Sequence, residues 1–187
     1  MLDRKSLLAA AVAVCCALPV TVTAVPHAHA DAPTQAQTHA RTQARTRLRN
    51  GAVIAHLWVK RMRLKVKVRT GVSEAVLRRG VGHYPGTARP GQEGNTVLLG
   101  HRTTWLRPFN QLDRMRRGDR IVLRVGRTSY VYRVRSRHVI DPRNRSVLEP
   151  VPFRPRSAPH GRYVTLISCT PKGSDRWRLV VVGTLDR

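Results

Sequence analysis

The chain has 187 residues, which is long enough for one domain with an apolar core and short appendages. Its 35 lysine and arginine residues stand against 10 acidic ones, which gives a formal net charge of +25. Such a charge favours contact with polyanions, but the basic residues are spread along the whole chain rather than gathered on one helix. This scatter argues against a nucleic-acid-binding protein and favours a solvated basic surface. In an exported protein, the polyanion would be anionic lipid or a wall polymer.

The first 30 residues have the pattern of an export signal. A basic start precedes an uncharged stretch over residues 6–25, and Ala28-His29-Ala30 forms a small-residue cleavage pattern. An apolar stretch of about 20 residues is also long enough to span a bilayer if it is not cut. A cleaved signal peptide and a retained membrane anchor therefore both remain open.

Residues 31–52 are predicted to form a basic, low-complexity linker. The segment is rich in Ala, Thr, Gln and Arg, has few large apolar residues and shows little periodicity. The folded domain is therefore expected to begin at Val53 and to extend over residues 53–187.

From Val53 onward, short strand-like runs alternate with turns. The expected strands cover residues 57–59, 62–68, 96–100, 120–125, 129–134, 147–148, 163–168 and 178–182. One short helix is expected over residues 73–80, with Ser73 as its N-cap, and a helical turn over residues 109–112. Many short strands with almost no helix predict an all-β fold, namely a small antiparallel barrel.

Cys169 is the candidate nucleophile. Cys15 and Cys16 lie in the export signal, so Cys169 is the one thiol of the folded region and has no disulfide partner there. It ends a predicted strand, and Arg178 begins the next strand. A thiol and a guanidinium in this arrangement fit acyl transfer, with the sulfur as nucleophile and the guanidinium as donor to the developing oxyanion. An inert buried cysteine beside a surface arginine is the alternative.

His101 is the candidate proton carrier. It directly follows the predicted strand over residues 96–100, so it lies at a strand end as Cys169 does. An imidazole close to a thiol can give and take protons through acylation and deacylation. The other histidines of the domain stand in less organised contexts and are expected to be structural or surface residues. These are His56, His83, His138 and His160.

Seven motifs, in this order, resemble those of sortases, in particular the class E sortases of actinobacteria. They are GVGHYPGT (80–87), GNT (94–96), GHRTT (100–104), PFNQL (108–112), GD (118–119), TLISC (165–169) and RLVV (178–181). The resemblance covers about residues 53–185, which is the whole predicted domain.

The resemblance implies a closed eight-stranded sortase-type β-barrel with short helical turns, on the outer side of a Gram-positive membrane. It implies a transpeptidase whose thiol cleaves a C-terminal sorting signal after Thr, forms a thioacyl intermediate and passes the acyl group to a cell-wall amine. The nucleophile maps to Cys169, the general acid/base to His101 and the oxyanion-stabilising arginine to Arg178, with Arg176 as the rival.

The implied partners are secreted proteins that bear the sorting signal and the amine of the peptidoglycan precursor. The membrane is a further partner if the N-terminal segment stays attached, and no nucleic acid is expected. No cofactor or metal is expected either, because calcium needs several oxygen ligands close together and the acidic residues of the domain are dispersed.

Substrate binding is assigned to Tyr84, Thr104 and Ser168. The class E resemblance implies a signal of the form Leu-Ala-x-Thr-Gly, where most sortases prefer Leu-Pro-x-Thr-Gly. Tyr84 is expected near the groove that holds this signal. An aromatic residue that simply packs its own loop is the alternative.

The chain departs from the family pattern at Ser168, where threonine is usual, and at Thr170, where class E members often carry histidine. Both departures concern the subclass rather than the chemistry. The signature of L,D-transpeptidases is absent, and the order of His101 before Cys169 is opposite to that of papain-like proteases. A non-catalytic β module that binds the wall or another polyanion is the alternative. It would explain the charge but not the ordered histidine, cysteine and arginine.

Overall fold

The computed structural model describes residues 50–186, all within the compact unit Thr42–Arg187. The predicted signal segment, residues 1–30, and residues 31–49 of the predicted linker lie outside the described residues. In the part of the chain that is described, no helix is long and apolar enough to cross a membrane.

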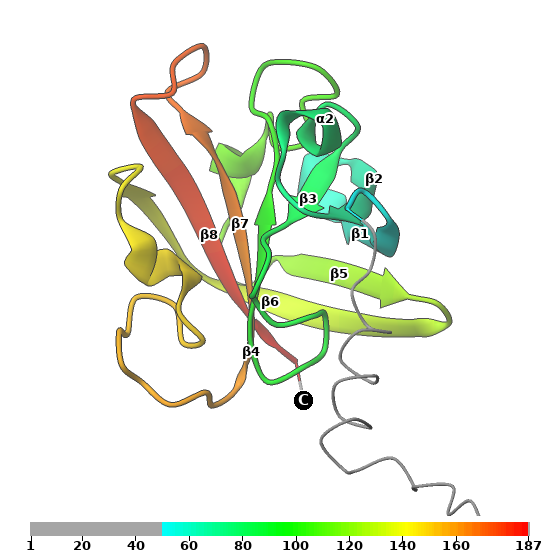
Figure 1. The fold of residues 1–187 in the computed structure, drawn as a ribbon, viewed down its shortest axis with the longest axis vertical. Helices are drawn as coiled ribbons and strands as arrows, with labels where there is room; N and C mark the ends of the chain where they lie inside the picture. The colour runs from blue at the N-terminus through cyan, green and yellow to red at the C-terminus, as the bar shows by residue number, and fades with distance from the viewer. Residues whose placement is uncertain (1–49, 187) are drawn as a thin grey trace, which may run out of the picture. The chain divides into compact units, whose positions relative to one another are not determined.

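Eight strands close into a barrel in the order β1-β2-β3-β4-β7-β8-β6-β5 (Figure 1). The strands are β1 (Val53–Val59), β2 (Leu64–Thr70), β3 (Val81–His83), β4 (Gly94–Leu99), β5 (Arg120–Val125), β6 (Thr128–Ile140), β7 (Arg162–Thr170) and β8 (Trp177–Leu185). The short helical pieces are η1 (Lys60–Met62), α2 (Glu74–Leu77), η2 (Leu112–Arg114) and η3 (Arg145–Leu148). The predicted eight-stranded barrel with short helical turns is confirmed.

The barrel is mixed, so the expectation of an antiparallel barrel was wrong at two of its strand pairings. β2 pairs with β3 in parallel, and β4 pairs with β7 in parallel, from Gly94 with Arg162 to Leu99 with Ile167. Parallel pairing cannot be read from a run of short strands, because it joins segments far apart in the chain. Its consequence is that β4 and β7 end at the same edge of the sheet.

The region between β6 and β7 differs from the sequence prediction. Val147 and Leu148, which were expected to form a strand, lie in the 3-10 helix η3. The side chain of Asn144 accepts a hydrogen bond from the Ser146 amide and so caps this helix. This capping interaction favours a helical turn at two residues whose side chains alone suggested a strand.

β6 and α2 differ from the prediction in length. β6 continues to Ile140 because it pairs with β8 along its second half, beyond a register shift between Val134 and Ser136. The helix predicted over residues 73–80 shortens to the four residues of α2. Ser73 occupies the N-cap position, as predicted, but its side chain makes no capping hydrogen bond.

Strand alternation divides the apolar side chains into two clusters. The inner cluster fills the barrel and includes Leu98, Leu166 and Val181, which are fully buried. The outer cluster lies on the opposite face of the same strands, beneath η3. Its buried members are Val97, Val147, Ile167, Val180 and Val182.

Candidate active site

Cys169 and Arg178 are direct partners across the antiparallel β7–β8 ladder. Residues opposite each other in such a ladder project to the same face, with Cβ atoms about 4.5–5.5 Å apart. Cys169 comes two residues after Ile167, and Arg178 two residues before Val180, so both continue the face of the outer cluster. Both side chains are half-buried, and the thiol of Cys169 is free.

The guanidinium of Arg178 is held near the β7–β8 turn. Its Nη1 donates to the carbonyl oxygen of Asp175 at 2.6 Å and to that of Trp177 at 3.2 Å. These bonds use one of three guanidinium nitrogens, so the donors on Nε and Nη2 can serve a bound oxyanion. Arg176, the rival, is exposed, precedes β8 and lies 5.7 Å from the ring centroid of Trp177. The register therefore favours Arg178 as the partner of the thiol.

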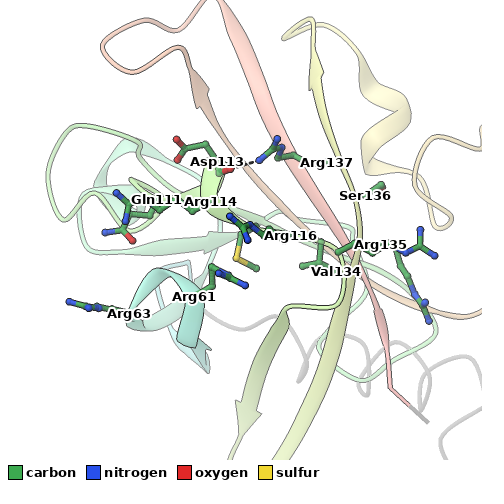
Figure 2. A pocket seen from close by; sticks show the side chains of 12 residues that line it. Arg61, Arg63, Gln111, Asp113, Arg114, Arg116, Val134, Arg135, Ser136 and Arg137 are labelled. Carbon is green, nitrogen blue, oxygen red and sulfur yellow. Dashed lines mark hydrogen bonds between the residues drawn. The ribbon is translucent and has the colours of Figure 1, made fainter.

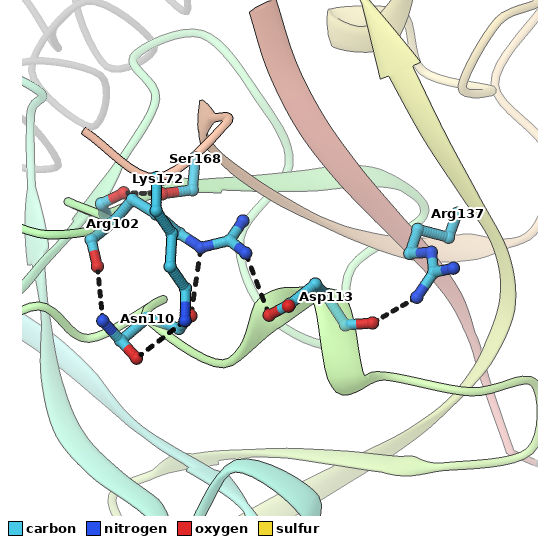
Figure 3. A network of polar contacts seen from close by, with 7 residues as sticks. Arg102, Asn110, Asp113, Arg137, Ser168 and Lys172 are labelled. Atoms are coloured by element: carbon cyan, nitrogen blue, oxygen red, sulfur yellow. Dashed lines mark hydrogen bonds and ion pairs between the residues drawn. The ribbon is translucent and has the colours of Figure 1, made fainter. Parts of the chain in front are cut away.

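His101 is positioned by the end of β4. The Gly100 amide donates to the carbonyl oxygen of Ile167 at 3.2 Å, which extends the β4–β7 pairing by one residue. Ser168 Oγ donates to the carbonyl oxygen of Gly100 at 2.7 Å (Figure 3). These two bonds fix the backbone of His101 beside the strand that carries Cys169.

The imidazole of His101 faces α2. Its Nε2 lies 3.7 Å from Glu74 Oε2, and the side chain is 20% exposed. Within residues 50–186, this Nε2 is buried and has no hydrogen-bond partner. The other carboxylate oxygen of Glu74 accepts a hydrogen bond from Arg78 Nε at 3.1 Å. Glu74 thus lies where it can orient the imidazole ring. The sequence did not indicate this contact, because Glu74 was recognised only as a residue of a short predicted helix.

Arg102, which directly follows His101, is the centre of a polar network with Asp113 and Asn110, called the buried hub below (Figure 3). Its side chain is 4% exposed and pairs with Asp113 Oδ1 at 2.9 Å. Its Nε donates to the carbonyl oxygen of Asn110 at 3.0 Å, and Asn110 Nδ2 donates back to the carbonyl oxygen of Arg102 at 3.1 Å. The loop that follows His101 is therefore closed on itself by this pair.

The charge of Arg102 acts on the active site as well. Burial lowers the pKa of Arg102, and the negative charges of Asp113 and of an ionised Cys169 oppose this effect. A guanidinium remains charged in a protein, so Arg102 places a fixed positive charge within electrostatic range of the sulfur. Sequence reasoning missed this residue; its position next to the candidate histidine was the available signal.

The three residues assigned to substrate binding have different surroundings. Tyr84 is half-buried against the outer cluster, and its hydroxyl accepts a hydrogen bond from Arg145 Nη2 at 2.9 Å. Thr104 is exposed in the loop after His101. Ser168 is 3% exposed, and its hydroxyl is engaged by Gly100, so it serves the backbone of the site rather than its surface.

The other histidines do not join the site. His83 is buried, and its Nε2 donates to the carbonyl oxygen of Ala88 at 2.9 Å, while burial lowers its pKa. His56, His138 and His160 are exposed. Between residues 50 and 186, no three His, Cys, Asp or Glu side chains gather in a way that could hold a metal ion.

Comparison with known sequences agrees with this geometry. The sortase domain family matches residues 57–186. The chain is 37% identical over 143 residues to sortase SrtE1 of Streptomyces coelicolor, and 32% identical over 132 residues to sortase SrtE2 of the same organism. These alignments cover 72% and 65% of the chain, but 41% and 51% of the two relatives. The chain thus spans about half the length of the curated relatives it matches.

Solved structures show the same similarity. The crystal structure of sortase E1 from Streptomyces coelicolor with a tripeptide in the active site has a TM-score of 0.68 at 36% identity, covering 73% of this chain and 90% of that one. The SrtA sortase of Actinomyces oris has a TM-score of 0.71 at 28% identity, covering 75% and 83%. The range that the sortase domain family matches, residues 57–186, contains Cys169, His101 and Arg178.

Proposed function

Because the chain belongs to the sortase family and resembles its class E members, we propose that it is a cysteine transpeptidase that acts outside the cytoplasmic membrane. Its thiol cleaves a C-terminal sorting signal after Thr and transfers the acyl group to a cell-wall amine. The observation that supports this most strongly is the register pairing of Cys169 with Arg178 at the sheet edge that also carries His101.

Acylation forms a bond from the Cys169 sulfur to the carbonyl carbon of the signal threonine. Negative charge moves to the carbonyl oxygen, where the free guanidinium donors of Arg178 stabilise it. The C–N bond to the following residue then breaks as His101 gives a proton to the leaving amine. A thioacyl group remains on Cys169, and the C-terminal fragment leaves.

Deacylation reverses these roles. An incoming amine attacks the thioacyl carbon, and His101 takes the proton that this amine loses. The C–S bond breaks, the new amide leaves, and Cys169 returns to its thiolate form. Water in place of the amine gives hydrolysis instead, and the amine of a peptidoglycan precursor gives a protein attached to the wall.

The outer cluster gives the substrate an apolar surface next to the thiol. Tyr84, Leu99 and Ile140 are partly buried against it, on the face that Cys169 and Arg178 continue. The segment that precedes the signal threonine would lie along this surface. The class E resemblance supports a signal of the form Leu-Ala-x-Thr-Gly, which brings an alanine rather than a kinked proline against it.

Incubation of the full chain with a Leu-Ala-x-Thr-Gly peptide and a short amine tests the proposal. The wild-type protein should release the C-terminal fragment and form the amine conjugate. Cys169→Ala should do neither while keeping the melting temperature, because it removes the one thiol of residues 50–186. Turnover by this variant would contradict the proposal. A non-catalytic polyanion-binding module would give no turnover with either protein.

A further inference from the structure

A concave site, the arginine cleft, lies between the segments around η1 and η2 and the middle of β6 (Figure 2). Its volume is about 990 Å³, and its lining does not include Cys169, His101 or Arg178. The side chains that line it are mostly basic. Its arginines are Arg61, Arg63, Arg114, Arg116, Arg117, Arg135 and Arg137.

Folding gathers these arginines from three separate parts of the chain. Arg61 and Arg63 belong to η1 and its C-cap, and the η2 segment adds residues 114–117. Arg135 lies at the register shift of β6, and Arg137 comes from the part of the strand that follows it. Because arginine is frequent along the whole sequence, the short basic runs at residues 60–63 and 114–117 do not stand out, and only the fold shows that they lie together.

The acidic residues near the arginine cleft are already engaged. Asp113 lines the cleft, but its carboxylate pairs with the buried Arg102 at 2.9 Å. Asp119 binds Arg61 through both oxygens, at 2.8 Å and 2.9 Å, and the hydrogen bond from Arg61 is the main cause of its lowered pKa. These carboxylates leave most of the positive charge of the cleft uncompensated.

Among residues 50–186, Arg61 is the one arginine of the cleft in an ion pair, and four of the other six make no side-chain hydrogen bond either. These are Arg63, Arg114, Arg116 and Arg117, and all four are exposed. Like charges that converge on a hollow raise its potential and concentrate anions there. A ligand that binds these groups must therefore bring several negative charges.

The chemistry of the guanidinium group narrows the choice of anion. Its planar fork donates two parallel hydrogen bonds to a phosphate, and arginine is favoured where several such bonds are made. The arginines are spread around a hollow that is much larger than one phosphate group. A hollow of this kind suits a compact ligand better than an extended one. We propose that the arginine cleft binds a ligand that carries two or more linked phosphates.

The arginine cleft is separate from the candidate active site, but the two are connected through one residue. No arginine of the cleft takes part in the proposed mechanism, so failure of either proposal leaves the other intact. The connection runs through Asp113, whose carboxylate holds Arg102 while its carbonyl oxygen accepts a hydrogen bond from Arg137 Nη1 (Figures 2 and 3). Asp113 therefore contacts both a cleft arginine, Arg137, and the buried Arg102, which directly follows His101.

Titration of the full chain with inorganic tripolyphosphate by calorimetry tests the proposal. The cleft variant combines Arg114→Gln, Arg116→Gln and Arg117→Gln. The control variant combines Arg120→Gln, Arg124→Gln and Arg127→Gln, which are exposed residues of β5 and the following turn and lose the same charge. The cleft variant should weaken binding by at least about 10-fold, since each lost charged donor contributes more than a neutral one. The control should change it by less than about 3-fold.

Equal weakening by both variants would overturn the proposal, because net charge alone would then explain the binding. Both variants should retain peptide cleavage and the wild-type melting temperature. Arg117→Gln alone should weaken binding in the same direction, which keeps the test decisive if the triple variant does not fold.

Two further ligands identify the source of the phosphates. Farnesyl diphosphate in phosphatidylcholine vesicles represents a lipid-linked diphosphate, and tripolyphosphate represents a soluble one. Tighter, cleft-dependent binding of either supports the proposal and assigns the source. Cleft-dependent binding that is restricted to phosphatidylglycerol vesicles or to an oligonucleotide would contradict it, since those ligands carry separated phosphates.

Discussion

Cys169 and Arg178 face each other across the β7–β8 ladder, although a six-residue turn, residues 171–176, separates their strands. The register of the strand pairing places the two side chains together, because residues paired in an antiparallel ladder lie on one face of the sheet regardless of the turn conformation. The thiol and the guanidinium are therefore held by two nine-residue strands that are paired in register up to the turn, which is the kind of rigid support that a reacting site needs.

Replacement of Arg178 by alanine should lower kcat/KM for the signal peptide by about 10²–10³-fold, the cost of one lost oxyanion donor. The fall should appear mainly in kcat, because the donor acts on charge that develops in the transition state. Arg176→Ala is the matched control and should change kcat/KM by less than about 3-fold, since Arg176 is exposed and outside β8. The reverse result from the two variants would assign the role to Arg176.

The buried hub predicts an effect on stability. Asp113→Asn leaves the Arg102 guanidinium buried without its counter-charge, so the free energy of unfolding should fall by about 1–3 kcal/mol. Peptide cleavage should fall too, because Arg102 closes the loop behind His101. Asp186→Asn removes the partner of Arg133 in a pair that is 41% and 46% exposed, and should cost less than about 1 kcal/mol. Denaturant unfolding of the two variants measures the difference in their free energies of unfolding. Equal losses would show that the Arg102–Asp113 pair does not contribute more to stability than an exposed pair.

His83 predicts a pH dependence of stability. Burial lowers its pKa in the folded protein, so the unfolded chain takes up the proton at higher pH than the folded one. The contribution to stability is complete above the ordinary histidine pKa, about 6.5, and is lost as the pH falls below it. The free energy of unfolding should therefore decrease between about pH 7 and pH 5. His83→Gln should flatten this decrease, whereas His138→Gln, at an exposed position, should leave it unchanged. The same slope in both variants would show that other groups cause it.

The position of Tyr84 leads us to expect a preference between two sorting-signal peptides. The Leu-Ala-x-Thr-Gly peptide should be processed about 10-fold faster than its Leu-Pro-x-Thr-Gly twin, a difference that one small group in a groove can produce. Tyr84→Ala should narrow the ratio of the two specificity constants. Tyr84→Phe keeps the ring on the outer cluster, loses the hydrogen bond from Arg145, and should preserve the ratio. Equal constants in the wild-type protein would remove the class E preference and leave the thiol mechanism standing.

The sequence predicted the strands and their ends better than it predicted their partners. Cys169 and His101 could be placed at strand ends because a β-type run stops directly at each of them. The parallel β4–β7 pairing, which brings those ends together, joins Gly94 with Arg162 and has no local signal. The resemblance to sortases implied that Cys169 and His101 share one site, but neither it nor the local pattern predicted this parallel pairing.

The parts of the site that sequence reasoning missed depend on tertiary contacts. Glu74 reaches His101 from a four-residue helix, and Arg102 finds Asp113 across a loop. The polar second half of β6 lacks the alternation of a half-buried strand, so its pairing with β8 was not predicted. Ser168 was assigned to the substrate, while the direction of its side chain depends on strand parity and on the carbonyl group of Gly100.

Intact-mass spectrometry of the full chain, mixed briefly with the Leu-Ala-x-Thr-Gly peptide in the absence of an added amine, tests the thioacyl mechanism most directly. The wild-type protein should gain the mass of the peptide acyl group up to its threonine, on Cys169, and a nucleophilic amine should discharge it. Arg178→Ala should accumulate the adduct more slowly, and Cys169→Ala should form none. An adduct on another residue, or peptide cleavage by Cys169→Ala, would contradict the account.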